Sequence, residues 1–98
     1  MESKKAYIYW THPEHKHRKL PLGMYYTPHI VRKDDPFQVH WSVRFAITEE
    51  NQSDHGPIEF NMLVDNDATR LFFDELKPNT RFVLLEALTE VAHGHILG

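Results

Sequence analysis

Large apolar side chains alternate with mostly polar ones along residues 37–47. The apolar set occupies the odd positions Phe37, Val39, Trp41, Val43, Phe45 and Ile47. Successive side chains of an extended strand point to opposite faces, so this pattern predicts one long strand with an apolar face and a polar face. The apolar face of such a strand must be covered by further sheet. The sequence therefore predicts a β-protein.

Shorter segments with the composition or alternation of strands occur along the rest of the chain, separated by turn residues. They span residues 6–10, 58–64, 81–85 and 89–97. Only residues 86–88 separate the last two, so we expect a terminal hairpin. Gly94 within this hairpin predicts a bulge or a close approach between two backbones.

Residues 20–31 are apolar, but three residues that interrupt strands occur among them. These are Pro21, Gly23 and Pro28. Proline cannot donate to a strand ladder, so we expect an edge strand or a shaped loop here. Residues 11–19 and 51–57 are polar and are predicted to be loops.

Two structures remain open for residues 68–76, namely a short helix capped by Asp67 and a further strand. The clearer segments amount to about six short strands with frequent turns between them. This pattern is typical of a small sandwich or barrel. We expect a closed barrel, because closure removes the edges that so many aromatic strands would otherwise expose.

Length and composition narrow the class of protein. A chain of 98 residues can form one domain with a single core, and the absence of cysteine excludes disulfides and thiolate sites. No run of residues is long and apolar enough to span a membrane, and the N-terminus lacks the apolar region of a secretory signal. We therefore expect one cytoplasmic domain, residues 1–98, without a membrane partner.

Charge is unevenly distributed along the chain, although the net charge is only −3. Residues 1–33 contain seven Lys or Arg and two Glu, whereas residues 34–98 contain four Lys or Arg and twelve acidic residues. Such asymmetry can indicate a polar interaction surface, or it can disappear when strands from both halves interleave. The acidic total does not favour broad, non-specific binding to nucleic acid.

Two patches of sequence have distinctive patterns of residues. The first has the pattern Arg-x-x-Pro-x4-Tyr-x-Pro, and its residues are Arg18, Pro21, Tyr26 and Pro28. The second is an Arg-Phe-x-x-x-Glu segment followed by Val-x-x-Gly, and its residues are Arg81, Phe82, Glu86, Val91 and Gly94. In this order the two patches resemble the C-terminal β-barrel of translation elongation factor Tu. The resemblance spans nearly the whole chain and implies an antiparallel barrel of about six strands of the Greek-key type.

The resemblance also implies partners. In that family the barrel contacts a GTPase domain, an exchange factor and the T-stem of aminoacyl-tRNA. This chain has no Gly-x4-Gly-Lys-Ser/Thr phosphate-binding loop, so the resemblance covers the barrel without the GTPase domain. The family's tRNA contact uses a Gly-Gly-Arg turn, where this chain has Ala87, Leu88 and Thr89, so the contact is not carried over by identical residues.

The basic N-terminal loop and its aromatic neighbours are the best candidates for an interaction surface. Lys16, Arg18 and Lys19 could contact phosphates, while Tyr25 could stack on a base or on a partner's side chain. Thr89 completes this set as the residue at the position of the family's contact turn.

Histidine is abundant, with eight residues in the chain. His93 and His95 are two residues apart in a predicted strand, so they face the same side and could bind one metal ion, with His15 and His17 completing the site. Two exposed histidines on the polar face of a strand are also common, so the spacing alone does not establish a site.

Acidic pairs occur at predicted turns, where carboxylates accept backbone hydrogen bonds, and none has the features of a general acid–base pair. We therefore expect a non-catalytic binding module without a cofactor, whose partner is a protein. RNA binding through the basic loop is the first alternative, and metal binding by the histidines is the second.

Overall fold

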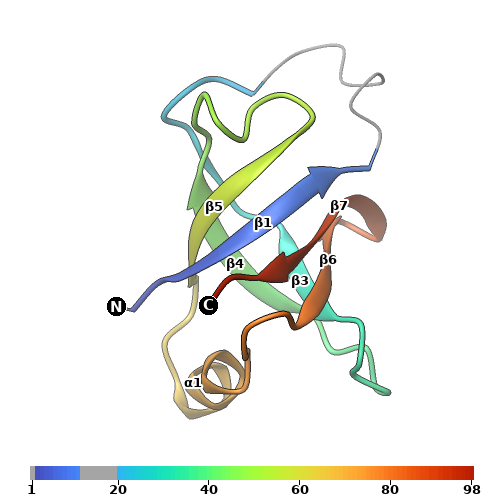
Figure 1. Ribbon diagram of the computed structural model, residues 1–98. Coiled ribbons are helices and arrows are strands. Elements are labelled where there is room, and N and C mark those ends of the chain that lie inside the picture. Colours follow the sequence, from blue (N-terminus) through green and yellow to red (C-terminus); the bar gives the residue numbers. More distant parts are fainter. Residues whose placement is uncertain (1, 12–19) are drawn as a thin grey trace.

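The computed structural model describes residues 2–11 and 20–98, and its strands form an antiparallel sheet closed into a barrel (Figure 1). The elements are β1 (Lys4–Trp10), β2 (Tyr25–Tyr26), β3 (His29–Arg32), β4 (Trp41–Ala46), β5 (His55–Met62), α1 (Asp67–Asp74), β6 (Arg81–Glu86) and β7 (Thr89–Ile96). Neighbouring strands follow the order β2-β4-β3-β6-β7-β1-β5, and a pairing of β4 with β5 closes the ring. The expected all-β class and closed six-stranded barrel are confirmed, with β2 as one extra strand.

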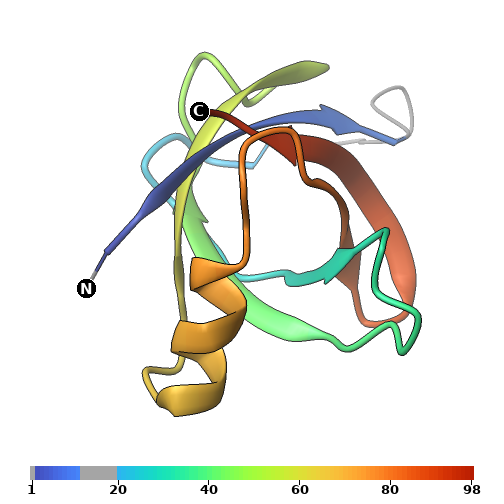
Figure 2. The ribbon, with the colours of Figure 1, turned by 60° about the horizontal axis from the view of Figure 1, so that its bottom comes forward.

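The connections between strands form a Greek key. Strands β3, β4 and β5 are consecutive neighbours, and after α1 the chain returns to place β6 beside β3. Strand β1 lies between β7 and β5, so the first and last strands of the barrel are paired. Figure 2 looks toward the end of the barrel at which α1 lies and shows the strands arranged as a ring.

Inward and outward side chains alternate along each barrel strand, as the period of a strand requires. In β1, Ala6, Ile8 and Trp10 are buried, whereas Tyr7 and Tyr9 lie on the outer face. The largest fully buried side chains from the other strands are Phe45, Phe60, Phe82, Ile30, Leu84, Val31 and Val43. Ile30 and Val31 are consecutive, so β3 is covered on both faces. The expected strand at residues 6–10 is thus confirmed.

Helix α1 resolves the segment that the sequence left open. Asn66, one residue before the expected Asp67, caps the helix: its Oδ1 accepts from the Thr69 N–H at 2.9 Å, and the Thr69 Oγ1 accepts from the Asn66 N–H at 3.0 Å. The buried face of the helix packs on the sheet, where the Phe72 ring stacks on Trp41 with 4.8 Å between centroids. The helix therefore belongs to the same core as the barrel.

The long strand predicted from Phe37 onward is wrong in its first half, because β4 begins at Trp41. Phe37 is 85 % exposed and Val39 is also exposed. The Asp35 carboxylate accepts hydrogen bonds from the N–H groups of Phe37 (2.9 Å) and Val39 (3.0 Å), and Gln38 has a left-handed φ of 51°. This turn uses backbone donors that a strand would have offered to its neighbour, so the alternating pattern there does not form a sheet.

We expect the turn around Asp35 to weaken in acid. Hydrogen bonds from the Val39 and Phe37 N–H groups lower the Asp35 pKa below its ordinary value of 3.8. A carboxyl group with a lowered folded-state pKa stabilises the fold above the unfolded pKa and loses this effect as the pH falls through the folded pKa. The difference in unfolding midpoint between the wild type and Asp35→Asn should therefore be constant near neutral pH and narrow below about pH 4. A difference that stayed unchanged in acid would contradict this role of the carboxylate.

Two further expectations need correction. Residues 51–57 are not simply a polar loop, because Asn51 is buried and β5 already begins at His55. Strand β3 is not an edge, since it lies between β4 and β6, whereas β2 pairs with β4 alone.

The terminal hairpin of β6 and β7 is confirmed, and so is a close backbone approach at Gly94. A Cβ atom added to Gly94 would overlap the backbone oxygen of Tyr7 on β1. The irregularity in the pairing of β6 with β7 lies between Leu84 and Leu85 instead of at the glycine. The polar loop predicted at residues 11–19 lies, apart from its first residue, outside the described residues.

Candidate functional site

The structure describes four of the nine candidate residues that the sequence predicted. Lys16, Arg18, Lys19, His15 and His17 lie outside the described residues. Tyr25 lies on β2, and Thr89, His93 and His95 lie on β7. These four do not form one site: Tyr25 is beside β4, whereas the two histidines are beside β1.

Tyr25 and its neighbours form an exposed surface, which we call the Tyr25 surface and define as Leu22, Met24, Tyr25 and Arg44. Tyr25 is 61 % exposed, and the guanidinium carbon of Arg44 lies 4.8 Å from the centroid of its ring. Leu22 and Met24 are exposed as well. Cation–π contact and backbone pairing with β4 therefore orient an aromatic ring that has little burial of its own.

The backbone under the Tyr25 surface is held by the residue that follows β4. The Gly23 N–H donates to the Ile47 oxygen, and the Ile47 N–H donates to the Met24 oxygen, both at 2.8 Å. Gly23 has a φ of +81°, a conformation that glycine adopts without steric cost. This turn allows Leu22, Met24 and Tyr25 to project outward within four residues of chain.

Tyr26 faces the opposite way and is a core residue, as expected. Its ring lies 5.9 Å from that of Trp10 and 5.7 Å from that of Phe45. Burial, and then the nearby Glu86 carboxylate, raise the Tyr26 pKa well above its ordinary value of 10.0. The adjacent tyrosines therefore have different roles, because strand alternation places one in the core and the other on the surface.

Thr89 is exposed at the bend of the terminal hairpin, paired in register with Glu86. Ala87 has a left-handed φ of 55°, and Leu88 is exposed next to it. The bend therefore presents an apolar side chain beside Thr89.

His93 and His95 face the same side of β7, as predicted, and lie within a larger cluster of rings on the outer face of the barrel. We call this cluster the ring face and define it as Tyr7, Tyr9, His55, His93 and His95. Tyr9 stacks on His93 with 5.7 Å between centroids, and Tyr7 stacks on His95 at 6.3 Å. His55 contacts both tyrosines, at 5.7 Å from Tyr7 and 5.6 Å from Tyr9, and its Nδ1 shares a 2.5 Å hydrogen bond with the Tyr7 hydroxyl.

Sequence reasoning missed three members of the ring face: Tyr7, Tyr9 and His55. The only sequence signal was the spacing of two residues between Tyr7 and Tyr9, which matches that of His93 and His95. Spacing within a strand says which side chains share a face, but it does not say which strands will be neighbours. The pairing of β1 with both β5 and β7 brings the rings together.

The described residues do not supply a metal site. No three His, Cys, Asp or Glu side chains in residues 2–11 and 20–98 lie where they could bind one ion. His95 packs on Tyr7, and the Nδ1 of His93 lies 3.8 Å from the Glu90 carboxylate. Within the described part of the chain these two histidines therefore belong to an aromatic surface, and the predicted contributions of His15 and His17 lie outside it.

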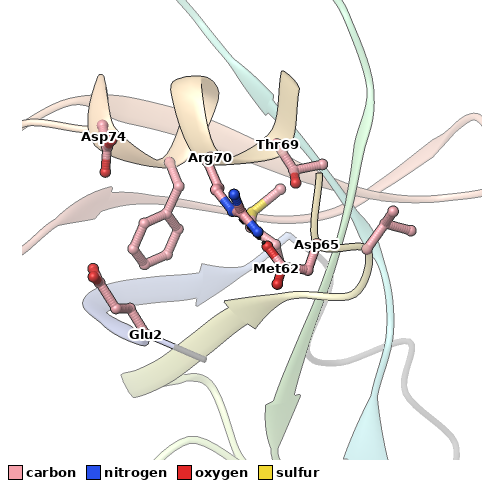
Figure 3. Close-up of a pocket in the computed structure, with 8 residues that line it drawn as sticks. Glu2, Met62, Asp65, Thr69, Arg70 and Asp74 are labelled. Atoms are coloured by element: carbon pink, nitrogen blue, oxygen red, sulfur yellow. Dashed lines mark hydrogen bonds and ion pairs between the residues drawn. The ribbon is translucent and has the colours of Figure 1, made fainter. Parts of the chain in front are cut away.

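A pocket of about 270 Å³ lies between α1 and the end of β5, and Figure 3 shows its lining. Its central feature is an ion pair in which the Arg70 Nε donates to the Asp65 Oδ1 at 2.9 Å. This pair lowers the Asp65 pKa and raises the Arg70 pKa. Thr69 is engaged in the helix cap, and Lys4 lies over the Phe73 ring at 4.6 Å. These groups hold α1 against the barrel, and their arrangement lacks a nucleophile with an adjacent base.

Within the described residues, no helix has the length and apolar character needed to cross a membrane. The sequence as a whole matches no protein-family model and no curated protein.

Proposed function

We propose that this barrel is a non-catalytic module that docks a protein partner through the Tyr25 surface. The observation that carries the proposal is the exposed Tyr25 ring held against Arg44, with two exposed apolar side chains beside it. Tyrosine, arginine and methionine are enriched at the centres of protein interfaces, and tyrosine and arginine are also enriched among the residues that contribute most binding energy.

The geometry of the surface supports docking because the side chains are already oriented. Two backbone hydrogen bonds to Ile47 hold Gly23 and Met24, so little conformational entropy is lost when a partner binds. The resemblance to the elongation factor barrel supports the same class of function, since that barrel docks beside another protein domain. This is an analogy of fold, so the residues of the interface are argued from this chain alone.

The cation of the Tyr25 surface is Arg44, which is exposed and lies 4.8 Å from the Tyr25 ring centroid, so we propose a partner with an acidic surface. The lack of cysteine fits a reducing compartment, and we propose that the module acts in the cytoplasm.

We expect the double variant Tyr25→Ala, Arg44→Ala to lose its partner. Truncation of central interface residues typically costs about 2 kcal/mol or more, so binding should weaken by about tenfold or more. The measurement is affinity capture from native lysate with both protein and RNA readouts, followed by titration of the purified partner. Phe37→Ala is the matched control, because Phe37 is more exposed than Tyr25 and precedes the opposite end of β4.

The proposal requires a specific protein that wild type and Phe37→Ala retain and the double variant loses. Equal retention by all three chains would place the interface elsewhere. Recovery of RNA without protein would replace protein docking with the RNA alternative.

A further inference from the structure

The ring face has a regular construction that comes from the strand register. Tyr7 is paired with His95 on β7, which is in turn paired with Arg81 on β6. Two residues further along β1, Tyr9 is paired with His93 on one side and His55 on the other. The rings therefore form two rows. The Tyr9 row runs across β5, β1 and β7, whereas the Tyr7 row has rings on β1 and β7 only, because the β5 partner of Tyr7 is Pro57. In Figure 1 these three strands lie next to one another with β1 in the middle.

The rings of both rows are open to solvent over much of their area. Tyr9 is 42 % exposed, His55 is exposed, and Tyr7, His93 and His95 are half-buried. Tyr7 and Tyr9 each contact an imidazole from β5 and one from β7, so part of each tyrosine ring is used by cross-strand contacts. The parts of the five rings that stay exposed form an aromatic surface that flat ligands can contact.

Positive charges lie beside the two rows. Lys5 is two residues before Tyr7 on the same face of β1, and Arg81 is the cross-strand neighbour of His95. Both are exposed, and within the described part of the chain neither forms an ion pair. Two carboxylates also lie nearby. Glu59, the cross-strand neighbour of Lys5, accepts from the Ser3 hydroxyl at 2.6 Å, and Glu90, 3.8 Å from the Nδ1 of His93, accepts from the Thr11 hydroxyl at 2.8 Å.

We propose that the ring face binds single-stranded nucleic acid, with bases stacked on Tyr7, Tyr9 and the neighbouring imidazoles and phosphates near Lys5 and Arg81. Exposed aromatic rings on strands with adjacent cations are the two elements of sequence-tolerant single-strand binding. The rows are two residues apart, about 7 Å, which is about twice the rise of stacked bases, so the bound strand is extended. A duplex hides the faces of its bases and is not recognised by this surface.

This site is separate from the Tyr25 surface. The ring face lies on β5, β1 and β7, whereas Tyr25 and Arg44 lie on β2 and β4. It also differs from the predicted RNA contact through Lys16, Arg18 and Lys19. A negative result for protein binding at the Tyr25 surface therefore does not affect the test of nucleic-acid binding at the ring face, and the reverse is also true.

The test is titration of the full chain into fluorescein-labelled single-stranded RNA and DNA of about ten nucleotides at low salt, with the matching duplex as a third probe. Tyr9→Ala and Tyr7→Ala should each weaken single-strand binding by about tenfold, because each removes one ring that contacts a base. Tyr9→Phe retains the ring and should bind like the wild type, and Phe37→Ala is the control for an exposed aromatic residue elsewhere. Circular dichroism and thermal melting show whether each variant is folded.

A second measurement on the wild-type chain does not depend on any variant folding. Addition of the oligonucleotide should shift the histidine ring proton resonances of His55, His93 and His95 in the NMR spectrum. The resonances of His29 and His40 are internal controls, because these two rings contact each other near β3 and the start of β4.

Single-strand binding that is lost with Tyr7→Ala and Tyr9→Ala, together with shifts confined to the three ring-face histidines, would support the proposal for whichever nucleic acid binds. Absence of binding to either single strand at low salt would overturn it. Binding that survives the loss of the rings but disappears in the double variant Lys16→Glu, Lys19→Glu would also overturn it, in favour of the basic loop.

Discussion

Substitution of Gly94 by alanine should destabilise the barrel by about 3 kcal/mol or more, at or beyond the upper end of ordinary overpacking costs. The added Cβ would overlap the backbone oxygen of Tyr7 and lie 3.1 Å from the Cα of Ile8. Both atoms belong to the backbone of β1, so no side-chain rotation can make room. The strands β1 and β7 would have to separate at the pairing that joins the first and last strands of the chain. For a domain of this size the melting temperature should fall by about 12 °C or more.

Gly23→Ala is the control for this prediction. Gly23 has a positive φ, but an added Cβ would have no atom within 4 Å, so only the backbone conformation is disfavoured. We expect a loss of about 1 kcal/mol there. Chemical denaturation of both variants measures the two free energies of unfolding. A cost at Gly94 no greater than that at Gly23 would show that β1 and β7 can move apart easily.

Substitution of Asn51 by alanine should cost about 3 kcal/mol, because its buried side chain satisfies three partly buried backbone groups. Asn51 is only 1 % exposed. Its Oδ1 accepts from the Thr48 N–H at 3.1 Å, and its Nδ2 donates to the oxygens of Ala46 at 3.2 Å and Pro57 at 3.1 Å. This one side chain therefore ties the end of β4 to β5. The free energy of unfolding from urea denaturation is the measurement.

Ser53→Ala is the control for Asn51→Ala. It shows whether the loss of an exposed polar side chain from this loop costs as much stability as the loss of the buried one. Ser53 is exposed, two residues after Asn51, and its substitution should change stability by no more than about 0.5 kcal/mol. If Asn51→Ala were as mild as Ser53→Ala, water would have to replace the three hydrogen bonds.

Strand composition and hairpin spacing were enough to predict much of the barrel from the sequence. The terminal hairpin was predictable because its two apolar segments are adjacent in the chain and only a short bend separates them. The prediction failed at Phe37 and Val39, whose alternation matched a strand. Hydrogen bonds from their backbone N–H groups to the Asp35 carboxylate compete with the sheet there, and apolar periodicity carries no information about such bonds.

The two candidate surfaces differ in how far the sequence could predict them. The exposure of Tyr25 was predictable because a tyrosine pair in a strand places one ring inside and one outside. Its contact with Arg44 was not, since it depends on the pairing of β2 with β4. The ring face was harder still to predict from the sequence, because its members come from β1, β5 and β7 and are up to 88 positions apart in the chain.

The order of amino acids alone determined the class of fold, since β-branched and aromatic residues at a period of two favour strands, and many short strands favour closure. The tertiary structure decided which strands became neighbours and in which register. It thereby decided that Tyr7, Tyr9 and three histidines share one surface and that Asn51 is buried. The physical reason is that side-chain direction is a local property of the backbone, whereas hydrogen bonding between strands joins residues whatever their separation in the chain.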